Sequence, residues 1–357
     1  MMVKNQITIL GIMSGTSLDG LDLAETFFSR ESNKASWSFE LNKCETIPYP
    51  KELSHRLRHA IELSEEGIQK LDIDLGVFIG KSINKFLGTR SQMVDCVASH
   101  GHTVFHQPEK GITVQIGSGE EIYNHCQISV INNFRVADVK AGGQGAPLVP
   151  IGDRDLFATY DFALNLGGIA NISFEKEGKR VAFDICPFNM ALNYLANEKG
   201  LPYDSEGKIA ATGRINESLL SELSQLPYLS QRGPKSLGIE DYQKNWLPLL
   251  KNSSISLEDK MATFIEHSAM EIASTINENK GKKVLVTGGG AYHQFFISRL
   301  KTYSRADIVL PESKIIEFKE ALIFAYLGLL RLEGRPNCLS SVTGAEYDVS
   351  AGDLIGF

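Results

Sequence analysis

The sequence predicts an α/β protein of two domains. Its 357 residues amount to two to three typical domains. Segments rich in Ile, Val and Phe, which are typical of buried strands, alternate with segments of helical periodicity. Two strand–glycine turn–strand patterns, at residues 7–28 and 162–175, open two similarly built halves. A Gly- and Pro-containing segment near Val136–Pro147 interrupts the periodic segments, and we expect the domain boundary there.

The expected strands are short apolar runs that end at Gly, Asn or Asp. They are Ile7–Met13, Leu21–Phe28, Cys96–Ser99, Thr113–Ile116, Ile128–Asn132, Phe162–Leu166, Ile169–Glu175, Arg180–Ile185, Lys283–Thr287 and Asp307–Leu310. Between them, the clearest expected helices are Leu257–Glu278 and Phe318–Leu332. Ser256 and Asp259 form a capping-box pattern at the start of the first helix.

Composition excludes several classes of protein. The chain has 43 acidic and 36 basic residues, which gives a net charge of −7, and it contains no run of Lys and Arg. We therefore do not expect nucleic acid or a membrane surface as a partner. The longest apolar stretch, Ala321–Leu330, is about half of a membrane span. Five cysteines, at least 30 residues apart, contain no C-x-x-C pair and indicate neither a disulfide framework nor a zinc site. The first apolar run lacks a cleavage site, so we expect a strand there and a cytoplasmic protein.

The first glycine turn, residues 11–22, is rich in small residues and hydroxyls. Converging backbone N–H groups and the hydroxyls of Ser14, Thr16 and Ser17 would form a nest for phosphate oxygens. Asp19 and Asp22 could hold Mg²⁺ directly or through water. The turn is not a Walker A loop, because it contains no Gly-Lys-Ser/Thr, and it is not a dinucleotide fingerprint, because a strand and not a helix follows it. The alternative is an ordinary hairpin turn whose glycines supply a positive φ.

Three further glycine turns recur along the chain. Gly167-Gly168 and Gly288-Gly289-Gly290 each follow a buried-looking strand, where ligands meet the carboxyl ends of a sheet. A fourth turn spans Gly142–Gly145. Tight bends without a ligand remain the alternative for all of them.

Asp184 is the expected catalytic acid or base. It follows the strand Arg180–Phe183, and a carboxylate at the end of a central strand suits the base of a sugar kinase, which takes a proton from the attacking oxygen. The alternative is a helix N-cap, because a helix is expected near Pro187.

Histidines cluster at His100, His102 and His106. The spacing invites a metal site, but no further ligands are nearby and no H-E-x-x-H motif occurs. We expect instead a polar loop in which His100, His102 and Thr103 bind sugar hydroxyls. A hydrolase nucleophile is not expected, because no G-x-S-x-G elbow surrounds Ser14, Ser17 or Cys186.

A series of motifs, in order along nearly the whole chain, resembles the anhydro-N-acetylmuramic acid kinases of bacterial cell-wall recycling. They are Gly11-x-Met-Ser-Gly-Thr-Ser-x-Asp-Gly-x-Asp22, His100-Gly-x-Thr103, Gln115-Ile-Gly117, Asn133-Phe-Arg135, Ala141-Gly-Gly-Gln-Gly-Ala-Pro-Leu-Val-Pro150, Asn165-x-Gly-Gly-Ile-Ala-Asn171, Asp184, Gly288-Gly-Gly-Ala291, Lys319-Glu-Ala321 and Thr343-Gly344. The first and fifth of these are long enough to be specific.

The resemblance implies an actin-like fold, in which two ribonuclease H-type α/β domains flank an ATP cleft. It implies a first lobe of residues 1–137 with the returning segment 333–357, and a second lobe of residues 138–332. The implied reaction uses Mg²⁺ and ATP: water attacks the anomeric carbon of 1,6-anhydro-N-acetylmuramic acid while its O6 takes the γ-phosphoryl group. The products are N-acetylmuramic acid 6-phosphate and ADP. A homodimer is implied as well.

The resemblance also assigns roles by position. Asp184 would be the general base, and Asp19 would bind the metal. The nucleotide would contact Gly15, Thr16, Ser17, Leu18, Asp19, Gly20, Leu21, Asp22, Gly167, Gly168, Gly288, Gly289 and Gly290. The sugar would contact His100, His102, Thr103, Gln144 and Glu320.

The chain departs from the family pattern beside the expected base. It has Asp184-Ile-Cys-Pro-Phe-Asn189 where the family commonly has Asp-Thr-Gly-Pro-Gly-Asn, and His102 replaces a common Gln. Two alternative functions therefore remain open: a kinase or phosphatase of the same fold that acts on another sugar or an acyl phosphate, and a nucleotide-binding regulatory protein with impaired catalysis.

Overall fold

The computed structural model describes residues 5–15, 18, 20–31, 36–231, 233–252 and 254–357. The chain divides into two compact units, of which the first comprises Met1–Leu156 and Phe318–Phe357 and the second comprises Phe157–Glu317. The expected boundaries at 137/138 and 332/333, and the expected linker at Val136–Pro147, differ from this division. Segments 138–156 and 318–332 belong to the first unit because they pack there by contacts that join distant parts of the sequence.

Buried polar contacts hold those two segments together. The ammonium of Lys319 lies 3.0 Å from the Asp153 carboxylate, and both side chains are almost fully buried. Tyr326 donates a hydrogen bond of 2.8 Å to Asp155. Loss of one partner of a buried ion pair costs several kcal/mol, so this contact fixes the segment 318–332 on the first unit.

The first unit is built on a six-stranded sheet with the order β13-β7-β4-β1-β2-β3. Its strands are β1 (Gln6–Ser14), β2 (Leu21–Ser29), β3 (Ser38–Ile47), β4 (Cys96–Ser99), β7 (Val130–Asn132) and β13 (Asp353–Ile355). The first three form an antiparallel meander, while β4 runs parallel to β1 and β7 runs parallel to β4. A separate two-stranded ribbon consists of β5 (His102–Gln107) and β6 (Ile112–Ile116).

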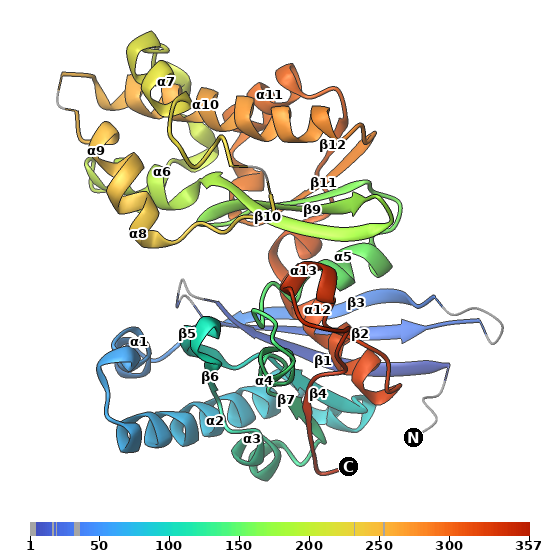
Figure 1. Cartoon of the computed structure of the whole chain (residues 1–357). Coiled ribbons are helices and arrows are strands. Elements are labelled where there is room, and N and C mark those ends of the chain that lie inside the picture. The colour runs from blue at the N-terminus through green and yellow to red at the C-terminus, as the bar shows by residue number, and fades with distance from the viewer. Residues whose placement is uncertain (1–4, 16–17, 19, 32–35, 232, 253) are drawn as a thin grey trace. The chain divides into compact units, whose positions relative to one another are not determined.

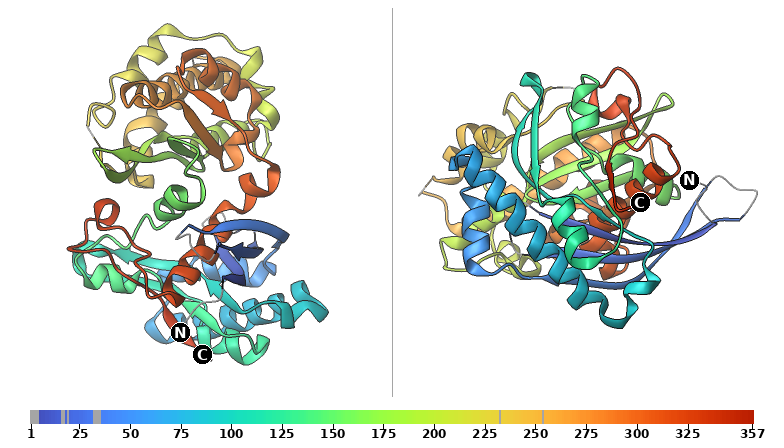
Figure 2. Two further views of the ribbon diagram at one scale, coloured as in Figure 1. Left: turned by 90° about the vertical axis from the view of Figure 1, so that its right-hand side faces the viewer. Right: turned by 90° about the horizontal axis from the view of Figure 1, so that it is seen from below.

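Helices cover both faces of this sheet. They are α1 (Lys51–Arg58), α2 (Glu65–Leu87), α3 (Gly119–Cys126), α4 (Val136–Lys140), α5 (Pro150–Leu156), α12 (Ser313–Leu332) and α13 (Ser340–Thr343). The long α2 and the shorter α3 lie side by side (Figure 2), with Gly76 and Gly80 of α2 against α3. Their apolar side chains share one core with β1 and β2, around Leu75 and Ile79.

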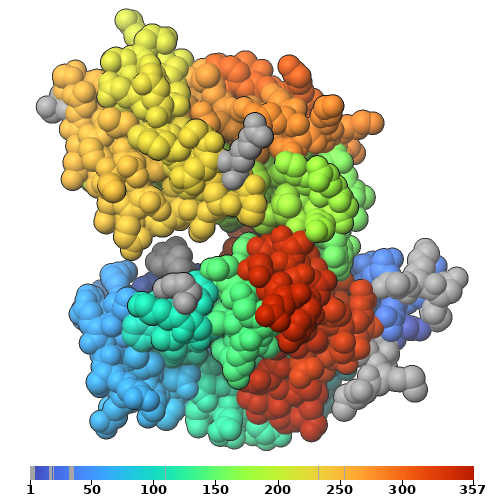
Figure 3. Space-filling view, in the orientation of Figure 1, coloured from blue at the N-terminus to red at the C-terminus, as the bar shows by residue number. Residues whose placement is uncertain are grey.

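The opposite face of the first sheet receives α12 (Figure 1). A Cβ atom at Gly11 of β1 would lie only 1.9 Å from the Ala321 carbonyl oxygen, so only glycine permits this close approach. Gly328 similarly lies against Ala98 of β4. In the space-filling view the C-terminal segment, in red, adjoins the green surface of the segment around α4 (Figure 3), where Glu346 N donates to Ala141 O.

The second unit repeats the same topology. Its strands are β8 (Phe162–Leu166), β9 (Ile169–Lys176), β10 (Lys179–Pro187), β11 (Lys283–Thr287) and β12 (Asp307–Val309). They have the order β10-β9-β8-β11-β12, with an antiparallel meander followed by two strands parallel to β8. Counted along the chain, both sheets therefore share the order 3-2-1-4-5 of a ribonuclease H-type domain, and the predicted fold class is confirmed.

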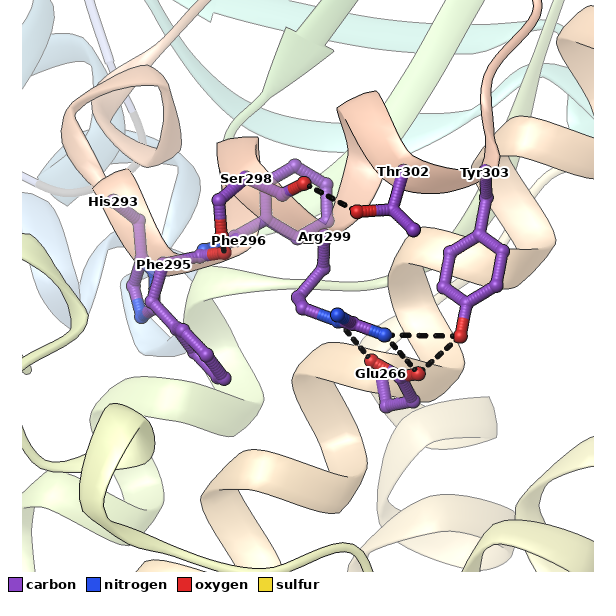
Figure 4. A network of polar contacts seen from close by, with 8 residues as sticks. All are labelled: Glu266, His293, Phe295, Phe296, Ser298, Arg299, Thr302 and Tyr303. Atoms are coloured by element: carbon purple, nitrogen blue, oxygen red, sulfur yellow. Dashed lines mark hydrogen bonds and ion pairs between the residues drawn. The ribbon is translucent and has the colours of Figure 1, made fainter.

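The helices of the second unit are α6 (Asn189–Asn197), α7 (Glu217–Ser224), α8 (Ile239–Asp241), α9 (Leu247–Leu250), α10 (Leu257–Glu278) and α11 (Gln294–Tyr303). The almost fully buried Glu266 of α10 accepts hydrogen bonds of 2.6 and 2.7 Å from Arg299 of α11 and another from the Tyr303 hydroxyl (Figure 4). These charge-assisted bonds fix α11 against α10. Both helices cover one face of the sheet (Figure 1).

The sequence-based elements agree closely with these bounds. The predicted helix Leu257–Glu278 is confirmed, and the Ser256 hydroxyl accepts from Asp259 N at 3.2 Å. The strand Ser38–Ile47 was not predicted, because its alternating half-exposed residues contain no apolar run. Over the part of the chain that the structure describes, no helix is long and apolar enough to cross a membrane.

Candidate active site

Polar side chains of the first unit gather where its parallel strands β1 and β4 end. Ser14 is the last residue of β1, His100 follows β4, and His102 begins β5. The backbone N–H of His100 donates to the Ile12 carbonyl at 3.0 Å, which ties this loop to β1. All three side chains are buried. The prediction of a loop was therefore wrong from His102 onward, because His102 and Thr103 lie in β5 and pair with β6. His100 and the start of β5 nevertheless lie at the carboxyl edge of the first sheet, the usual position of a ligand site in such folds.

Three of these groups form a chain of hydrogen bonds. The Tyr49 hydroxyl donates to Ser14 Oγ at 2.8 Å, and Ser14 Oγ lies 3.3 Å from His102 Nδ1. Burial raises the pKa of Tyr49 to about 12 and lowers the pKa of His102 below its ordinary value. All three groups are therefore neutral at pH 7.

His100 has a different neighbour. Its Nε2 accepts hydrogen bonds from Arg135 Nε at 3.2 Å and Nη2 at 2.8 Å, while Arg135 Nη1 donates to the Gly145 carbonyl at 2.7 Å. Burial, and then the Arg135 charge, lower the pKa of His100 well below its usual range. His100 is thus a neutral acceptor that holds Arg135 in place, and a contact between His100 and substrate stays a prediction.

Charged groups surround Arg135. Burial lowers its pKa to about 10, an effect partly offset by Glu320 and Asp138, so that it remains positively charged at neutral pH. Burial raises the pKa of Glu320, with Lys319 and Arg135 opposing this rise and Asp22 adding to it. Glu320, at the start of the buried part of α12, thus lies within electrostatic reach of Asp22 on β2. The first unit thus brings charged groups of both signs together around Arg135 and Glu320.

The first glycine turn is only partly described. Thr16, Ser17 and Asp19 lie outside the described residues, so their predicted roles stay predictions. Leu18 has a φ of +57° and its N–H donates to the Gly15 carbonyl at 3.3 Å. A Cβ at Gly20 would lie 2.7 Å from the Ile47 carbonyl, so Gly20 permits a close approach to β3. The Leu21 side chain is fully buried in the core, and residue 21 can reach a nucleotide only through its backbone.

The Gly142–Gly145 turn is organised by a buried carboxylate. Asp138 of α4, which is fully buried, accepts hydrogen bonds from Gly145 N at 2.7 Å and from the Thr343 hydroxyl at 2.8 Å. The Gln144 N–H donates to the Thr343 carbonyl at 2.8 Å, and the Gln144 side chain is exposed. Gln144 is therefore displayed by a rigid turn, as a ligand contact would require.

Asp184 lies within β10 at a β-bulge, where the register with β9 shifts between Asp184 and Cys186. The prediction of a central strand that ends before Asp184 was wrong, since β10 is an edge strand that continues to Pro187. The N-cap alternative is also wrong, because α6 begins after Phe188 and has no side-chain cap. Bulges re-aim side chains, which is a common device beside active sites.

A loop on the open side of β10 holds the Asp184 carboxylate. Its Oδ2 accepts from Leu237 N at 2.9 Å and from Ser236 Oγ at 3.4 Å. The backbone of Asp184 bonds to Lys235 O through its N–H and accepts from the Tyr228 hydroxyl at 2.9 Å. Burial raises the pKa of Asp184, and the two bonds to Oδ2 oppose the rise. Its Oδ1 accepts no hydrogen bond from any described residue and is available to a ligand or water.

The bulky residues that follow Asp184 point into the core. Ile185, Cys186 and Phe188 are at most 3% exposed. The Phe188 ring packs edge-on against Phe296, with ring centroids 4.6 Å apart, and a Cβ at Gly290 would lie 2.4 Å from this ring. The departure from the family motif therefore fills the interior of the second unit and leaves Asp184 Oδ1 unobstructed by these side chains.

The two glycine turns of the second unit meet at the ends of the parallel strands β8 and β11. Gly288 has a φ of +80°, and a Cβ there would lie 2.5 Å from Asn165 Oδ1. Gly289 lies beside Asn189, whose Nδ2 donates to the Leu166 carbonyl at 2.9 Å. The carbonyls of Gly167 and Gly168 accept from the first N–H groups of the α6 region. The structure thus brings Gly167, Gly168 and Gly288–Gly290 together, as a nucleotide contact would require.

Mg²⁺ fits the donors of the first unit better than a transition metal does. Within the described part of the chain no group of three or more His, Cys, Asp or Glu side chains could hold a metal ion. Asp22 and Glu320 offer carboxylate oxygens, and Asp22 also accepts a hydrogen bond of 2.6 Å from Thr46 Oγ1. Burial and the charge of Asp22 raise the pKa of Glu320, and a cation beside the two carboxylates would oppose this rise. Mg²⁺ commonly binds through one or two carboxylates, with water and phosphate completing its shell.

Sequence reasoning missed several residues that shape these sites. Tyr49 was missed because it follows the unrecognised strand Ser38–Ile47. Ser236 and Leu237 lie in a loop without a motif, and only their distance from Asp184 reveals them. Arg135 is the last residue of the Asn133-Phe-Arg135 motif, and Asp138 lies three residues later. Charged residues directly after an apolar strand were the pattern that could have indicated them. Thr103 was predicted, and its hydroxyl accepts weakly from Gln115 at 3.5 Å.

Solved structures share the architecture only distantly. Component A of the (R)-2-hydroxyglutaryl-CoA dehydratase of Acidaminococcus fermentans aligns with a TM-score of 0.44 and 12% identity, covering 88% of this chain and 95% of that chain. A ROK family glucokinase from Streptomyces griseus aligns with a TM-score of 0.40 and 11% identity, covering 89% and 97%. At these scores the fold is defined by the strand order above.

Sequence relatives are much closer. The anhydro-N-acetylmuramic acid kinase of Francisella tularensis subsp. novicida is 33% identical over 376 aligned positions, which cover 97% of each chain. The enzyme of the same name from Vibrio cholerae is 34% identical over 96% of each chain. A family model described as anhydro-N-acetylmuramic acid kinase matches residues 7–356. The chain therefore belongs to the anhydro-N-acetylmuramic acid kinase family.

Proposed function

We propose that the chain is an ATP-dependent kinase that opens and phosphorylates 1,6-anhydro-N-acetylmuramic acid in cell-wall recycling. The observation that carries this proposal is the family match over residues 7–356, which includes all four glycine turns and Asp184. The geometry supports the proposal in two ways. The Asp184 carboxylate has one oxygen, Oδ1, without a hydrogen bond from any described residue, and each unit has glycine turns at the ends of its strands.

The reaction balances with one water molecule. The water oxygen bonds to the anomeric carbon, and the bond from that carbon to O6 breaks. O6 bonds to the γ-phosphorus as the bond to the leaving ADP breaks, and the water gives up one proton. Because the phosphoryl group captures O6, no second acid is needed to protonate the leaving oxygen, in contrast to ordinary glycoside hydrolysis.

Asp184 is the proposed base for that proton. Leu237 N and Ser236 Oγ hold Oδ2, so the carboxylate has one orientation and Oδ1 remains for the water. Burial raises the pKa of Asp184, which strengthens it as a base. Tyr228, which bonds to the Asp184 carbonyl, further restricts the bulge.

The proposed nucleotide contacts are the backbone groups of the glycine turns. In the second unit Gly288 and Gly289 expose backbone beside Asn165 and Asn189, and in the first unit Gly15–Asp22 would hold phosphates. Mg²⁺ would be held by Asp22 and Glu320 together with Asp19, and when bound it neutralises phosphate charge. Homodimer formation and a cytoplasmic location stay predictions.

Product analysis tests the function. Incubation with ATP and the anhydro sugar is expected to give a product that gains one water and one phosphoryl group, with one ADP released per product. Mass spectrometry and a coupled ADP assay measure both. Phosphate gain without ring opening, or ADP release that is independent of the sugar, would contradict the proposal, and a panel of other sugars tests the related kinases.

A further inference from the structure

The hydrogen-bond chain of Tyr49, Ser14 and His102 joins three positions that are far apart in sequence. Tyr49 lies two residues beyond β3, Ser14 ends β1 and His102 begins β5. The distances are 2.8 Å from Tyr49 Oη to Ser14 Oγ and 3.3 Å from Ser14 Oγ to His102 Nδ1. The three side chains are at most 8% exposed. A buried polar chain of this kind is retained only if its hydrogens are consistently directed.

The direction of the hydrogens follows from what each group can donate. Tyr49 donates to Ser14, so one lone pair of Ser14 Oγ is occupied. Ser14 has a single hydroxyl hydrogen, and no other described residue accepts it. A buried hydroxyl normally uses its hydrogen, and His102 Nδ1 is the acceptor within reach. Ser14 therefore donates to His102 Nδ1.

This direction fixes the tautomer of His102. A neutral imidazole that accepts at Nδ1 carries its hydrogen on Nε2. His102 Nε2 makes no hydrogen bond with any described residue, and it is absent from the buried unpartnered atoms of the described chain. It is thus a solvent-accessible donor. Gly101, which precedes His102, has a φ of +72°, and a Cβ atom there would lie only 2.5 Å from the Ile116 carbonyl oxygen. The backbone that carries the His102 ring therefore has a conformation that requires glycine at position 101.

We propose that Tyr49 and Ser14 hold His102 as the Nε2–H tautomer, so that His102 donates a hydrogen bond to an oxygen of the sugar substrate. This role rests on the proposed sugar kinase function and assigns the orientation of one specificity contact. Tyr49 and Ser14 are positioning residues, whereas His102 contacts the ligand. His102 thus adds a neutral donor at this edge of the first unit, and a hydroxyl or carbonyl oxygen of the sugar is an acceptor that satisfies it.

The tautomer is measured directly by NMR. Two-bond ¹H–¹⁵N spectra of the full chain, labelled only at its eight histidines, distinguish Nε2–H from Nδ1–H imidazole, and the spectrum of His102→Gln identifies the His102 signals. The wild type is expected to show the Nε2–H pattern at pH 7.5. Tyr49→Phe keeps the aromatic ring, whose centroid lies 5.4 Å from that of Phe78, and removes only the hydroxyl. Because Ser14 then no longer accepts a hydrogen bond from Tyr49, we expect a mixture of His102 tautomers in this variant. An Nδ1–H pattern in the wild type overturns the proposal without any substitution.

Kinetics test the ligand contact. Tyr49→Phe is expected to raise KM for the sugar about 3- to 10-fold with kcat nearly unchanged, as for loss of one oriented hydrogen bond. His102→Gln, whose amide offers an N–H at a similar place, should retain most activity, whereas His102→Glu, which only accepts when ionised, should not. Tyr123→Phe, whose hydroxyl has no hydrogen bond among the described residues, is the matched control.

The outcomes separate the two proposals. An unchanged KM in Tyr49→Phe, or a His102→Glu variant as active as the wild type, overturns the donor role of His102. A wild type that never turns over the sugar contradicts the proposed function instead, whichever tautomer the spectrum shows.

Discussion

The two sheets of this protein have the same strand order but different chemistry at corresponding positions. In the second unit Asp184 pairs with Asn171 of the middle meander strand, and in the first unit the corresponding pair is Thr46 with Asp22. The meander turn is two residues long between β8 and β9, whereas six residues separate β1 from β2. The shared topology therefore provides equivalent edges, and a few residues at those edges make them different: the second unit has the proposed base Asp184, and the first unit has a longer turn between β1 and β2.

Replacement of the Asp184 carboxylate is the most direct test of the difference between the two sheet edges. Asp184→Asn is expected to lower kcat by about 10²- to 10⁴-fold, because an amide cannot take the proton from water. Sugar-dependent ADP release measures the effect. Thr46→Ala, at the corresponding position of the first sheet, removes the 2.6 Å bond to Asp22 and should lower kcat less than tenfold. Equal losses in both variants, or a fully active Asp184→Asn, would show that the two edges do not differ in this way.

The glycine turns of the two units are held by different means. In the first unit a buried carboxylate serves the turn, so Asp138→Ala leaves the Gly145 N–H and the Thr343 hydroxyl without their acceptor. We expect a loss of about 3 kcal/mol in the free energy of unfolding, measured in urea. Asp74, which is half-buried at the surface and pairs with Arg56, is the control, and Asp74→Ala should cost less than about 1 kcal/mol. Similar losses for both would mean that Asp138 is not the organising group.

In the second unit close packing takes the place of that carboxylate. Gly288→Ala forces a side chain into a φ of +80° and against Asn165 and Leu166, so we expect a loss of about 2 kcal/mol and weaker ATP binding by calorimetry. Gly168→Ala has its nearest neighbour, Met190, at 3.7 Å and should fold like the wild type. A Gly288→Ala variant of unchanged stability would argue against this packing constraint.

Local patterns in the sequence were sufficient to predict the fold class and the turns at the ends of the strands. Apolar runs gave the strands of both meanders except Ser38–Ile47, and the glycine motifs marked the turns. The compact units have other bounds than the predicted domains, because the pair of Lys319 with Asp153 and the contact of Gly11 with Ala321 join residues more than 150 positions apart. The supports of the site, such as Tyr49 for Ser14 and Leu237 for Asp184, were hidden for the same reason. Spacing along the chain contains no information about such contacts.

The smallest expected effect concerns how finely the Asp184 edge is adjusted. The proposed base must be ionised to act, and burial raises the pKa of Asp184 above the ordinary aspartate value. We therefore expect kcat/KM to fall on acidification at a higher pH than an exposed aspartate would give. The Ser236 hydroxyl opposes this rise by donating to the ionised form. Ser236→Ala should therefore move the acidic limb of the pH–rate profile further upward, while activity at pH 8 changes little. A limb that moves downward would mean that Ser236 stabilises the protonated carboxyl, which would require the hydroxyl to accept rather than donate. Because no group of the first sheet is assigned as a base, Thr46→Ala should leave the midpoint of this limb where it is, and the pH profile then distinguishes the two edges even where the rates do not.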